Sequence, residues 1–297
     1  MKCFRTCLLV LLLSTILLTR TPTSAHSDVA PFLTIAFINV GQGDSAFLQD
    51  HTGFDVLIDG GPSTAGGVVT EFIRSRVSGA LDLIIVSHPD SDHIGGLIQV
   101  LQAADIPVAS VLYSGYPGST QTWNNFVSTV NQKGLVLTAI HSPATLTWSS
   151  MTSYLIHPPQ GLNNPSTNDS SLVFRVNFGA NNLLFTGDIG FSVENNLVNQ
   201  NSITPSNVLK VAHHGSKYSS GDSFLAALQP KDAIISVGTN PYGHPSLETL
   251  DRLQQVGSRI WRTDVWNTIF MHCTLIECRV LNPEFFTHRV YLPGITR

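Results

Sequence analysis

The sequence is poor in charged residues, and basic side chains are not in excess. Only 12% of the 297 residues are Asp, Glu, Lys or Arg, and 16 basic residues stand against 20 acidic ones. A protein that binds nucleic acid through surface charge usually presents a basic face. The composition therefore argues against such a face, and any phosphate substrate would have to be held mainly by metal ions and local donors.

Long apolar runs are also scarce, because the only one, residues 8–18, lies at the start of the chain. Two basic residues precede it, and its length is typical of a signal-peptide core and short for a membrane span. Small residues at 23–25 offer a cleavage position. We expect residues 1–25 to be a signal peptide, with an uncleaved anchor as the alternative. Residues 26–297 are then expected to form a secreted domain without a membrane channel of its own.

Cysteine is scarce as well, since residues 26–297 contain only Cys273 and Cys278. A zinc site built from cysteine needs four ligands, so these two residues argue against one. In an oxidising compartment they could pair across a hairpin, and two separately buried thiols are the alternative.

The chain does have one dense polar stretch, SHPDSDHIGG, at residues 87–96. The apolar run Leu81–Val86 before it predicts a buried strand, and Ile94–Ala104 predicts a helix. Loops at strand ends hold the ligands of open α/β sheets. Without a cation, the metal-capable side chains of this loop would repel each other or be poorly solvated. The stretch therefore predicts a metal site, rather than a solvated turn or a helix cap, with four candidate ligands: His88, Asp90, Asp92 and His93.

Other predicted strands also end in side chains that can bind metal. These are Asp59, Asn168, Asp169, Asp188, His213, His214 and His244. The remaining histidines lack this placement, and we expect ordinary surface or core positions for His26, His51, His141, His157, His272 and His288.

The order of the predicted elements indicates the fold class. Strands cluster first, helices intervene, and the pattern repeats in the second half of the chain. This order predicts an α/β (α+β) protein in which two sheets pack face to face with helices outside, in one domain.

Seven segments resemble, in order, the motifs of the metallo-β-lactamase superfamily. They are NVGQGDS (39–45), LIDGG (57–61), SHPDSDHIGG (87–96), NDSSLV (168–173), LLFTGD (183–188), LKVAHHGS (209–216) and SVGTNPYGHPS (236–246). More closely, the set is similar to the C-terminal hydrolase domain of ComEC-type DNA-uptake proteins. The resemblance implies a four-layer αβ/βα sandwich with a metal site at one edge.

The resemblance also implies two divalent metal ions, manganese or zinc, with the ligands divided between them. His88 and Asp90 would hold one ion, and the adjacent Asp92 and His93 would hold the other. Asp188 would bridge the two, as its counterpart does in the superfamily.

Two ligand positions stay open within the resemblance. Either His213 or His214 would complete the second site, and we favour His213 because it comes first after the strand. Asn168 or Asp169 stands where the superfamily often has another histidine, which makes Asp169 a further candidate ligand.

Other motif residues have supporting roles in this interpretation. Asp59 would orient a ligand histidine, Asp44 would hold its loop in the same way, and Gln42 would lie near the pocket. A solvated surface residue is the alternative for Lys217. Three residues could neutralise substrate charge: Ser216, Lys217 and His244.

Asp90 departs from the commonest superfamily motif, which has histidine there. A carboxylate moves the preference of the site from zinc towards manganese or magnesium. ComEC-type proteins share the substitution, so it does not indicate an inactive enzyme. Asn39, where that family often has Asp, is expected to be tolerated.

Two metal ions about 3.5–4 Å apart can hold a bridging hydroxide that attacks a phosphodiester. Asp92 and His244 are the residues we expect in the catalytic machinery. The sequence thus predicts a secreted metal-dependent phosphodiesterase or nuclease acting on nucleic acid or another phosphodiester. A hydrolase for a lactam, lactone or thioester is the alternative, and a non-catalytic DNA-binding module is a third interpretation.

Overall fold

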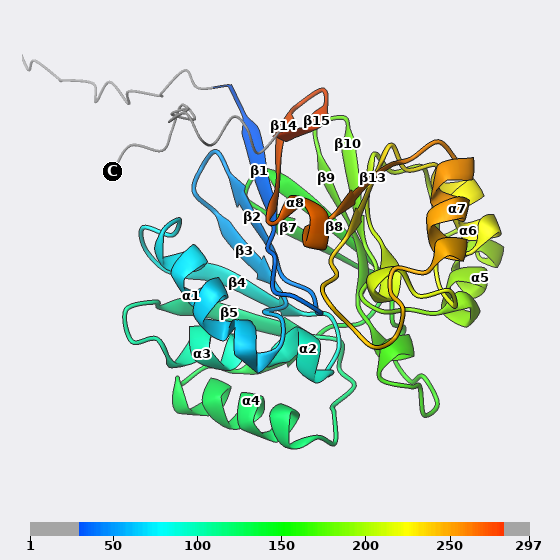
Figure 1. Ribbon diagram of the computed structural model, residues 1–297. Helices are drawn as coiled ribbons and strands as arrows, with labels where there is room; N and C mark the ends of the chain where they lie inside the picture. The colour runs from blue at the N-terminus through cyan, green and yellow to red at the C-terminus, as the bar shows by residue number, and fades with distance from the viewer. Residues whose placement is uncertain (1–29, 282–297) are drawn as a thin grey trace, which may run out of the picture.

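A computed structural model describes residues 30–281 of the chain and arranges them as two facing β-sheets (Figure 1). The predicted signal peptide, His26 and His288 lie outside the described residues. Within residues 30–281, no helix combines the length and the apolar character needed to cross a membrane.

The first sheet is built mainly from the N-terminal half of the chain. Its strands are β1 (Phe32–Phe37), β2 (Ala46–Asp50), β3 (Asp55–Ile58), β4 (Leu81–Val86), β5 (Val108–Tyr113), β6 (Leu137–Ala139), β14 (Ile269–Thr274) and β15 (Cys278–Leu281). Their order across the sheet is β15-β14-β1-β2-β3-β4-β5-β6. Strands β3 to β6 run parallel, so the ends of β3 and β4 meet at the same edge.

The second sheet comes from the other half of the chain. Its strands are β7 (Ala144–Trp148), β8 (Met151–His157), β9 (Val173–Phe178), β10 (Asn181–Phe185), β11 (Val208–Lys210), β12 (Asp232–Ile235) and β13 (Arg259–Arg262). They follow the order β13-β12-β11-β10-β9-β8-β7. Strands β10 to β13 are parallel, which again gathers several strand ends at one edge.

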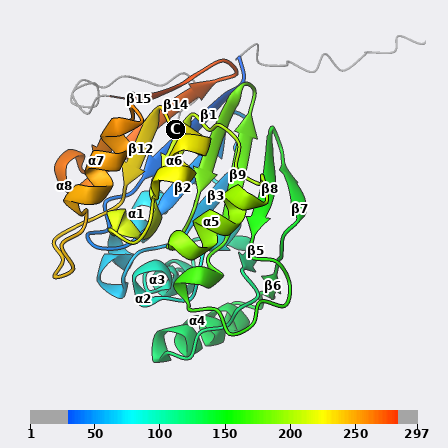
Figure 2. The same ribbon diagram turned by 90° about the vertical axis from the view of Figure 1, so that its right-hand side faces the viewer.

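Helices cover the outer face of each sheet, which confirms the predicted four-layer αβ/βα sandwich (Figures 1 and 2). The first sheet carries α1 (Gly66–Arg74), α3 (Leu97–Gln102) and α4 (Gln121–Gln132). The second carries α5 (Phe191–Asn199), α6 (Asp222–Leu228) and α7 (Leu247–Gln255). Short helices complete the set: α2 (Ser91–Ile94), α8 (Thr263–Trp266), and the 3₁₀ turns Ser63–Ala65, Asn168–Ser170 and Ala212–Gly215.

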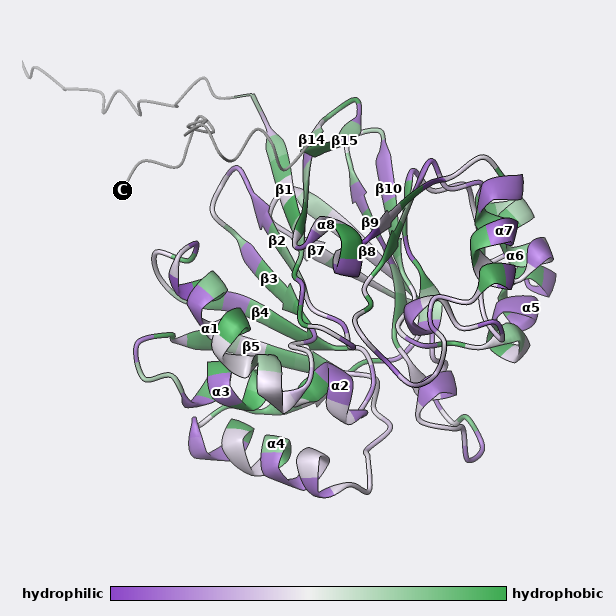
Figure 3. Ribbon diagram, viewed as in Figure 1, coloured by the Kyte–Doolittle hydropathy of each residue, from purple (hydrophilic) through white to green (hydrophobic). Residues whose placement is uncertain are grey.

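The core between the sheets is apolar and includes a row of stacked aromatic rings. Phe185 of β10 lies between Phe37 of β1 and Phe174 of β9, with ring centroids 6.1 and 5.2 Å apart. Strands and helices both carry hydrophobic and hydrophilic residues, as expected for elements that bury one face (Figure 3). Burial of this apolar surface is the main term that holds the two halves together.

Two local features test expectations from the sequence: the first differs from the prediction, and the second decides between two alternatives. The single helix predicted over residues 94–104 is instead the pair α2 and α3, because the chain passes backbone to backbone against the β3 loop at Gly95 and Gly96. Cys273 and Cys278 face each other across the β14–β15 pair and are joined as a disulfide, which decides between pairing and separate thiols.

Glycine makes the close approach of the two loops possible. A Cβ atom at Gly96 would lie 1.9 Å from the carbonyl oxygen of Gly60, and one at Gly43 would lie 2.3 Å from that of Asp92. The amide of Gly60 donates to the carbonyl of His93 at 2.7 Å. The loops that carry Asp44, Asp59 and His93 therefore pack as one unit.

We predict that Gly96→Ala destabilises the protein by about 1–3 kcal/mol, because the added methyl group forces these backbones apart. Denaturant unfolding should show a lower midpoint with an unchanged m value. Gly79→Ala is the matched control, since Gly79 is exposed and a Cβ there meets no atom within 4 Å. Equal midpoints for the two variants would contradict the close-packing argument.

Candidate metal centre

The two sheets bring their strand ends together at one edge, where five loops contribute side chains. Asp59 follows β3, His88 follows β4, and Asp188 follows β10. His214 lies in the 3₁₀ turn after β11, and Asp44 lies just before β2. Each half of the chain thus contributes side chains to one site.

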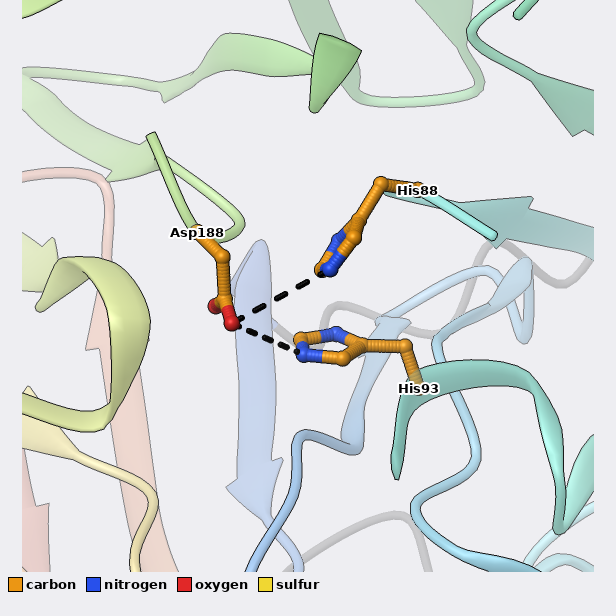
Figure 4. A group of neighbouring side chains, drawn as sticks. All are labelled: His88, His93 and Asp188. Atoms are coloured by element: carbon orange, nitrogen blue, oxygen red, sulfur yellow. Dashed lines mark ion pairs between the residues drawn. The ribbon is translucent and has the colours of Figure 1, made fainter. Parts of the chain in front are cut away.

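Asp188 lies at the centre of this group, facing three buried imidazoles. Its Oδ2 atom is 3.3 Å from Nε2 of His93 and 3.9 Å from Nε2 of His88 (Figure 4). The same oxygen is 3.4 Å from Nε2 of His214, and that nitrogen is also 3.4 Å from Oδ2 of Asp92. Four elements therefore direct their polar atoms at a common point.

The other ring nitrogen of each imidazole is already occupied. Nδ1 of His214 donates to the carbonyl oxygen of Ser236 at 2.9 Å, which requires the proton to sit on Nδ1. Nδ1 of His93 is 2.9 Å from the Asp59 carboxylate. Because these contacts hold the proton on Nδ1 in the neutral rings, both Nε2 atoms keep a lone pair directed at the site.

A chain of hydrogen bonds fixes His88 in the same way. Ser87 Oγ donates to Oδ2 of Asp59 at 2.6 Å, so its oxygen is free to accept from Nδ1 of His88 at 3.0 Å. Asp59 also accepts from the Ser87 amide at 2.8 Å. One carboxylate thus orients two of the three histidines, one directly and one through Ser87.

The atoms that face the centre have no partner within the described part of the chain. Nε2 of His88, His93 and His214 and Oδ1 of Asp188 are all buried without a hydrogen bond. Leaving such groups unpaired costs about 1–3 kcal/mol each. These atoms are therefore the expected ligands of something else, and imidazole nitrogen and carboxylate oxygen are the common protein ligands of divalent cations.

The spacing of these atoms fits shared cations better than direct ion pairs. Two triads, His88–His93–Asp188 and Asp92–His93–His214, each hold their ligand atoms within 4.8 Å of one another. A four-coordinate ion with bonds of about 2.0–2.2 Å keeps neighbouring ligand atoms about 3.3–3.6 Å apart. A charge-assisted hydrogen bond would bring them to about 2.7–2.9 Å. The donor set thus fits divalent metal. Because the two triads share His93, a second ion would need a ligand from outside them, such as Asp90 beside His88.

The charges of the site also favour a cation at its centre. Burial alone would lower the pKa of His93 and His214, but Asp188, together with Asp59 beside His93 and Asp44 beside His214, raises both pKa values well above their ordinary range. Burial alone would raise the pKa of Asp188, yet His214 and His93 hold that pKa well below its ordinary value. The carboxylates therefore stabilise positive charge where a metal would sit.

Asp44 and Lys210 support His214 from behind. Oδ1 of Asp44 is 3.2 Å from Nδ1 of His214, and its Oδ2 accepts from the buried Lys210 ammonium at 2.5 Å. Burial would raise the pKa of Asp44, but Lys210 and His214 lower it to about 2. The ammonium also donates to the carbonyl of Val211 at 2.9 Å, so the charge of Lys210 is satisfied inside the protein.

The structure also places the remaining residues that the sequence singled out. Oδ2 of Asp90 is 3.7 Å from Nε2 of His88 and accepts from Thr167 at 3.1 Å, so this carboxylate lies beside the first triad. Asp169 belongs to neither triad, and its backbone carbonyl accepts from Nε2 of His157 at 2.7 Å. Gln42 lies near the loop after β12, where its Oε1 accepts from Gly238 at 3.4 Å.

The geometry favours His214, and not His213, as the ligand from the turn after β11. Both residues adopt left-handed backbone conformations, with φ of 54° and 51°. This turn buries the ring of His214 in the cluster and directs His213 towards His244, with ring centroids 5.4 Å apart. Our preference for His213 rested on chain order alone, which cannot anticipate two successive left-handed residues.

Sequence reasoning missed Ser87 and Lys210. Ser87 was overlooked because a hydroxyl is a poor metal ligand, although its place between a buried strand and His88 makes it a neighbour of the site. Lys210 gave a clearer signal, since a lysine at the end of an apolar strand, three residues before the His213–His214 pair, needs a buried partner.

Comparison with known proteins assigns the family. The family model for the metallo-beta-lactamase superfamily matches residues 38–239. The chain belongs to the metallo-β-lactamase superfamily. Solved structures share its fold: it superposes on the metallo-β-lactamase fold protein YhfI from Bacillus subtilis with a TM-score of 0.55, at 12% identity over 82% of this chain and 100% of YhfI. The E377D mutant of the β-hydroxylase CmlA gives 0.53, at 13% identity over 82% of this chain and 54% of CmlA.

Curated relatives match this chain at higher identity than these solved structures do. ComE operon protein 3 of Bacillus subtilis is 31% identical over 253 residues, which are 79% of this chain and 32% of that protein. Competence protein ComA of Neisseria gonorrhoeae is 30% identical over 231 residues, 76% of this chain and 30% of ComA. The chain thus spans about a third of the length of these relatives, and the ComEC-type resemblance is confirmed.

We predict that His214→Ala removes most of the bound metal, whereas His213→Ala keeps it, because only His214 places Nε2 in a triad. Elemental analysis of the two purified variants after dialysis against a weak chelator measures the difference. The adjacent histidine serves as the control, since both changes remove the same side chain from the same turn. Equal metal loss from both, or greater loss from His213→Ala, would contradict the assignment.

We also predict that Asp59→Asn weakens metal affinity by about 10–100-fold, because the amide cannot hold His93 and Ser87 in their present orientations. Asn is the right substitution, since Asp59 has a left-handed φ of 57°, which Asn tolerates. Metal titration against a competing chelator gives the dissociation constant, and circular dichroism checks that the fold is kept. Unchanged affinity would show that Asp59 does not orient the ligands.

Proposed function

We propose that this protein is a secreted, metal-dependent phosphodiesterase that cleaves nucleic acid. Two divalent cations would be held by His88, Asp90 and Asp188 on one side and by Asp92, His93 and His214 on the other, with Asp188 shared between them. Secretion rests on the signal-like composition of residues 1–25. Manganese is the cation we favour, with zinc as the alternative.

The donor set is the observation that carries this proposal. Three carboxylates, Asp90, Asp92 and Asp188, accompany three imidazoles in one cluster. Oxygen-rich sites suit harder cations such as manganese, whereas imidazole-rich sites suit zinc. Lactam and lactone hydrolases of the superfamily usually have histidine where this chain has Asp90, which is why we place a phosphodiester ahead of those substrates.

The names of the relatives support a nucleic-acid substrate. One of them is competence protein ComA, and a further relative, Recombination protein 2 of Haemophilus influenzae, is 27% identical over 79% of this chain; both names concern DNA. Because this chain corresponds to only about a third of each relative, the activity of the whole relative does not transfer by similarity. The family match over residues 38–239 contains every residue of the two triads.

The residues of the chain prepare the site for in-line attack on phosphorus. When bound, divalent cations lower the pKa of coordinated water and stabilise charge on the phosphoryl oxygens. Asp59, Ser87 and the Ser236 carbonyl keep the imidazoles in the tautomer that binds such cations. Asp188 is buried and stays ionised, which keeps its oxygens available at the centre.

The mouth of the site offers groups for the substrate itself. Burial lowers the pKa of His244 to about 4, with His213 and His214 adding to the effect, so its ring is neutral at pH 7 and can donate from one nitrogen. Lys217 is exposed beside it and supplies a positive charge, while Ser216 is buried beneath. In this proposal His244 and Lys217 contact the phosphate or the leaving group.

Two other functions fit the fold and are distinguished by simple assays. Hydrolysis of a lactam, lactone or thioester would require turnover of such a substrate at rates above those for phosphodiesters. A binding module without catalysis would retain DNA affinity after its metal is removed. Every residue of both triads is present within the described part of the chain, and a full set of ligands favours catalysis over binding alone.

We predict that Asp92→Ala lowers metal-stimulated hydrolysis of bis-p-nitrophenyl phosphate by about 100-fold or more, since even changes behind a ligand cost about 10–100-fold. Release of p-nitrophenolate measures the rate. Asp251→Ala, on the exposed side of α7, is the control and should keep the wild-type rate. Undiminished activity of the Asp92 variant would contradict the assignment of the site.

We predict that manganese restores metal-stripped protein better than zinc, and that Asp90→His reverses this order by replacing an oxygen ligand with nitrogen. The assay adds back each metal at equal free concentration and measures phosphodiester hydrolysis in both proteins. Equal or better rescue of the wild type by zinc would count against the role given to Asp90.

A further inference from the structure

A cavity opens beside the metal centre and is lined in part by exposed aromatic rings. It has a volume of about 750 Å³, within the usual size of ligand pockets of about 300–1,000 Å³. His213 and His244 form its inner wall, next to the ligand His214. Its outer wall includes Tyr218 and Tyr242, whose exposed fractions are 65% and 70%. The cavity therefore continues outwards from the point where a substrate phosphate would bind.

Each tyrosine stands on a loop that is held in place by one polar side chain. Asn240 donates to the carbonyls of Gly238 and His244 at 2.8 Å and accepts from the amides of Tyr242 and His244 at 3.0 Å. These four hydrogen bonds fix the backbone around Tyr242. A large aromatic side chain that is exposed on a braced backbone is pre-organised for contact with a ligand.

The loop around Tyr218 is braced from α7. The Arg252 guanidinium donates to the carbonyls of Ser220, Ser219 and Lys217 at 2.8, 2.9 and 3.2 Å. The Lys217 ammonium lies over the Tyr218 ring, 5.1 Å from its centre. The loop thus presents an aromatic ring with a cation over one face and the opposite face open to a ligand.

The chemistry of this wall favours stacking over charge. Lys217 and Glu248 are the only Lys, Arg, Asp or Glu residues in the lining and have opposite signs, so the cavity has little net charge from them. Tyr242 lies near His244, with ring centroids 5.7 Å apart, which extends the aromatic surface towards the metal centre. Flat aromatic ligands stack on such surfaces through their ring faces, which adds binding energy that does not depend on the charge of the cavity.

We propose that Tyr218 and Tyr242 form a nucleobase-binding subsite that holds the base next to the scissile phosphodiester. This inference rests on the proposed phosphodiesterase function and names the part of the substrate that the cavity recognises. Every nucleobase has a face that can stack on tyrosine, so the subsite accepts bases without selecting a sequence. It would make the enzyme prefer base-bearing phosphodiesters to those that lack a base.

The test compares two single strands of equal length, pentathymidylate and a pentamer of abasic tetrahydrofuran nucleotides, with manganese-loaded protein. The measured quantity is the ratio of kcat/KM for the two strands. We expect a wild-type ratio of about tenfold or more, because loss of a base stacked on an aromatic residue weakens binding by about 5–150-fold. Tyr218→Ala and Tyr242→Ala should each lower the ratio, and the double variant should bring it close to one.

Matched variants separate stacking from other effects. Tyr218→Phe and Tyr242→Phe keep the ring and should keep the ratio, and Tyr154→Ala removes a 37% exposed tyrosine on β8 outside the cavity and should also keep it. A wild-type ratio near one, or an undiminished ratio in the double alanine variant, would overturn the subsite while leaving the phosphodiesterase function intact. Failure of the wild type to cleave either strand would overturn the proposed function itself.

Discussion

Three imidazole nitrogens that face one buried point constrain the whole site. Nδ1 of His88, His93 and His214 is held by Ser87, Asp59 and the Ser236 carbonyl, so Nε2 of each neutral ring is an acceptor, and none of the three has a hydrogen-bond partner within residues 30–281. Buried acceptors crowded around a carboxylate are stabilised only by positive charge. Two of these histidines come from the first sheet and one from the second, so a cation at this point would also tie the halves of the sandwich together.

The backbone around the cluster adopts strained conformations that position the side chains of the site. Asp59, His213 and His214 all have positive φ angles, which cost about 1–3 kcal/mol each in residues other than glycine. Gly43 and Gly96 let the neighbouring loops touch through their backbones. Such strain persists only where the surrounding packing imposes it, and here it turns the ring of His214 into the cluster and places Asp59 behind His93. The strained backbone therefore lowers the stability of the fold and fixes the positions of the donor atoms.

Much of this arrangement could be predicted from sequence, and the exceptions have physical causes. Ligand types at strand ends, as in the loop after β4 and at Asp188, indicate a metal site because parallel strands deliver their ends to one edge. The choice between His213 and His214 could not be predicted, because it depends on φ angles that residue types do not specify. The support from Lys210 and Ser87 was missed, because their partners lie far away along the chain and meet them only in the folded protein.

Anomalous diffraction from crystals grown with manganese is the most direct test of the central claim that the buried Nε2 atoms bind divalent metal. We predict two anomalous peaks. One lies within about 2.0–2.3 Å of Nε2 of His93 and His214, the other lies within the same distance of Nε2 of His88, and Asp188 contacts both peaks. Crystals that bind manganese elsewhere and show no peak between these nitrogens would contradict the account.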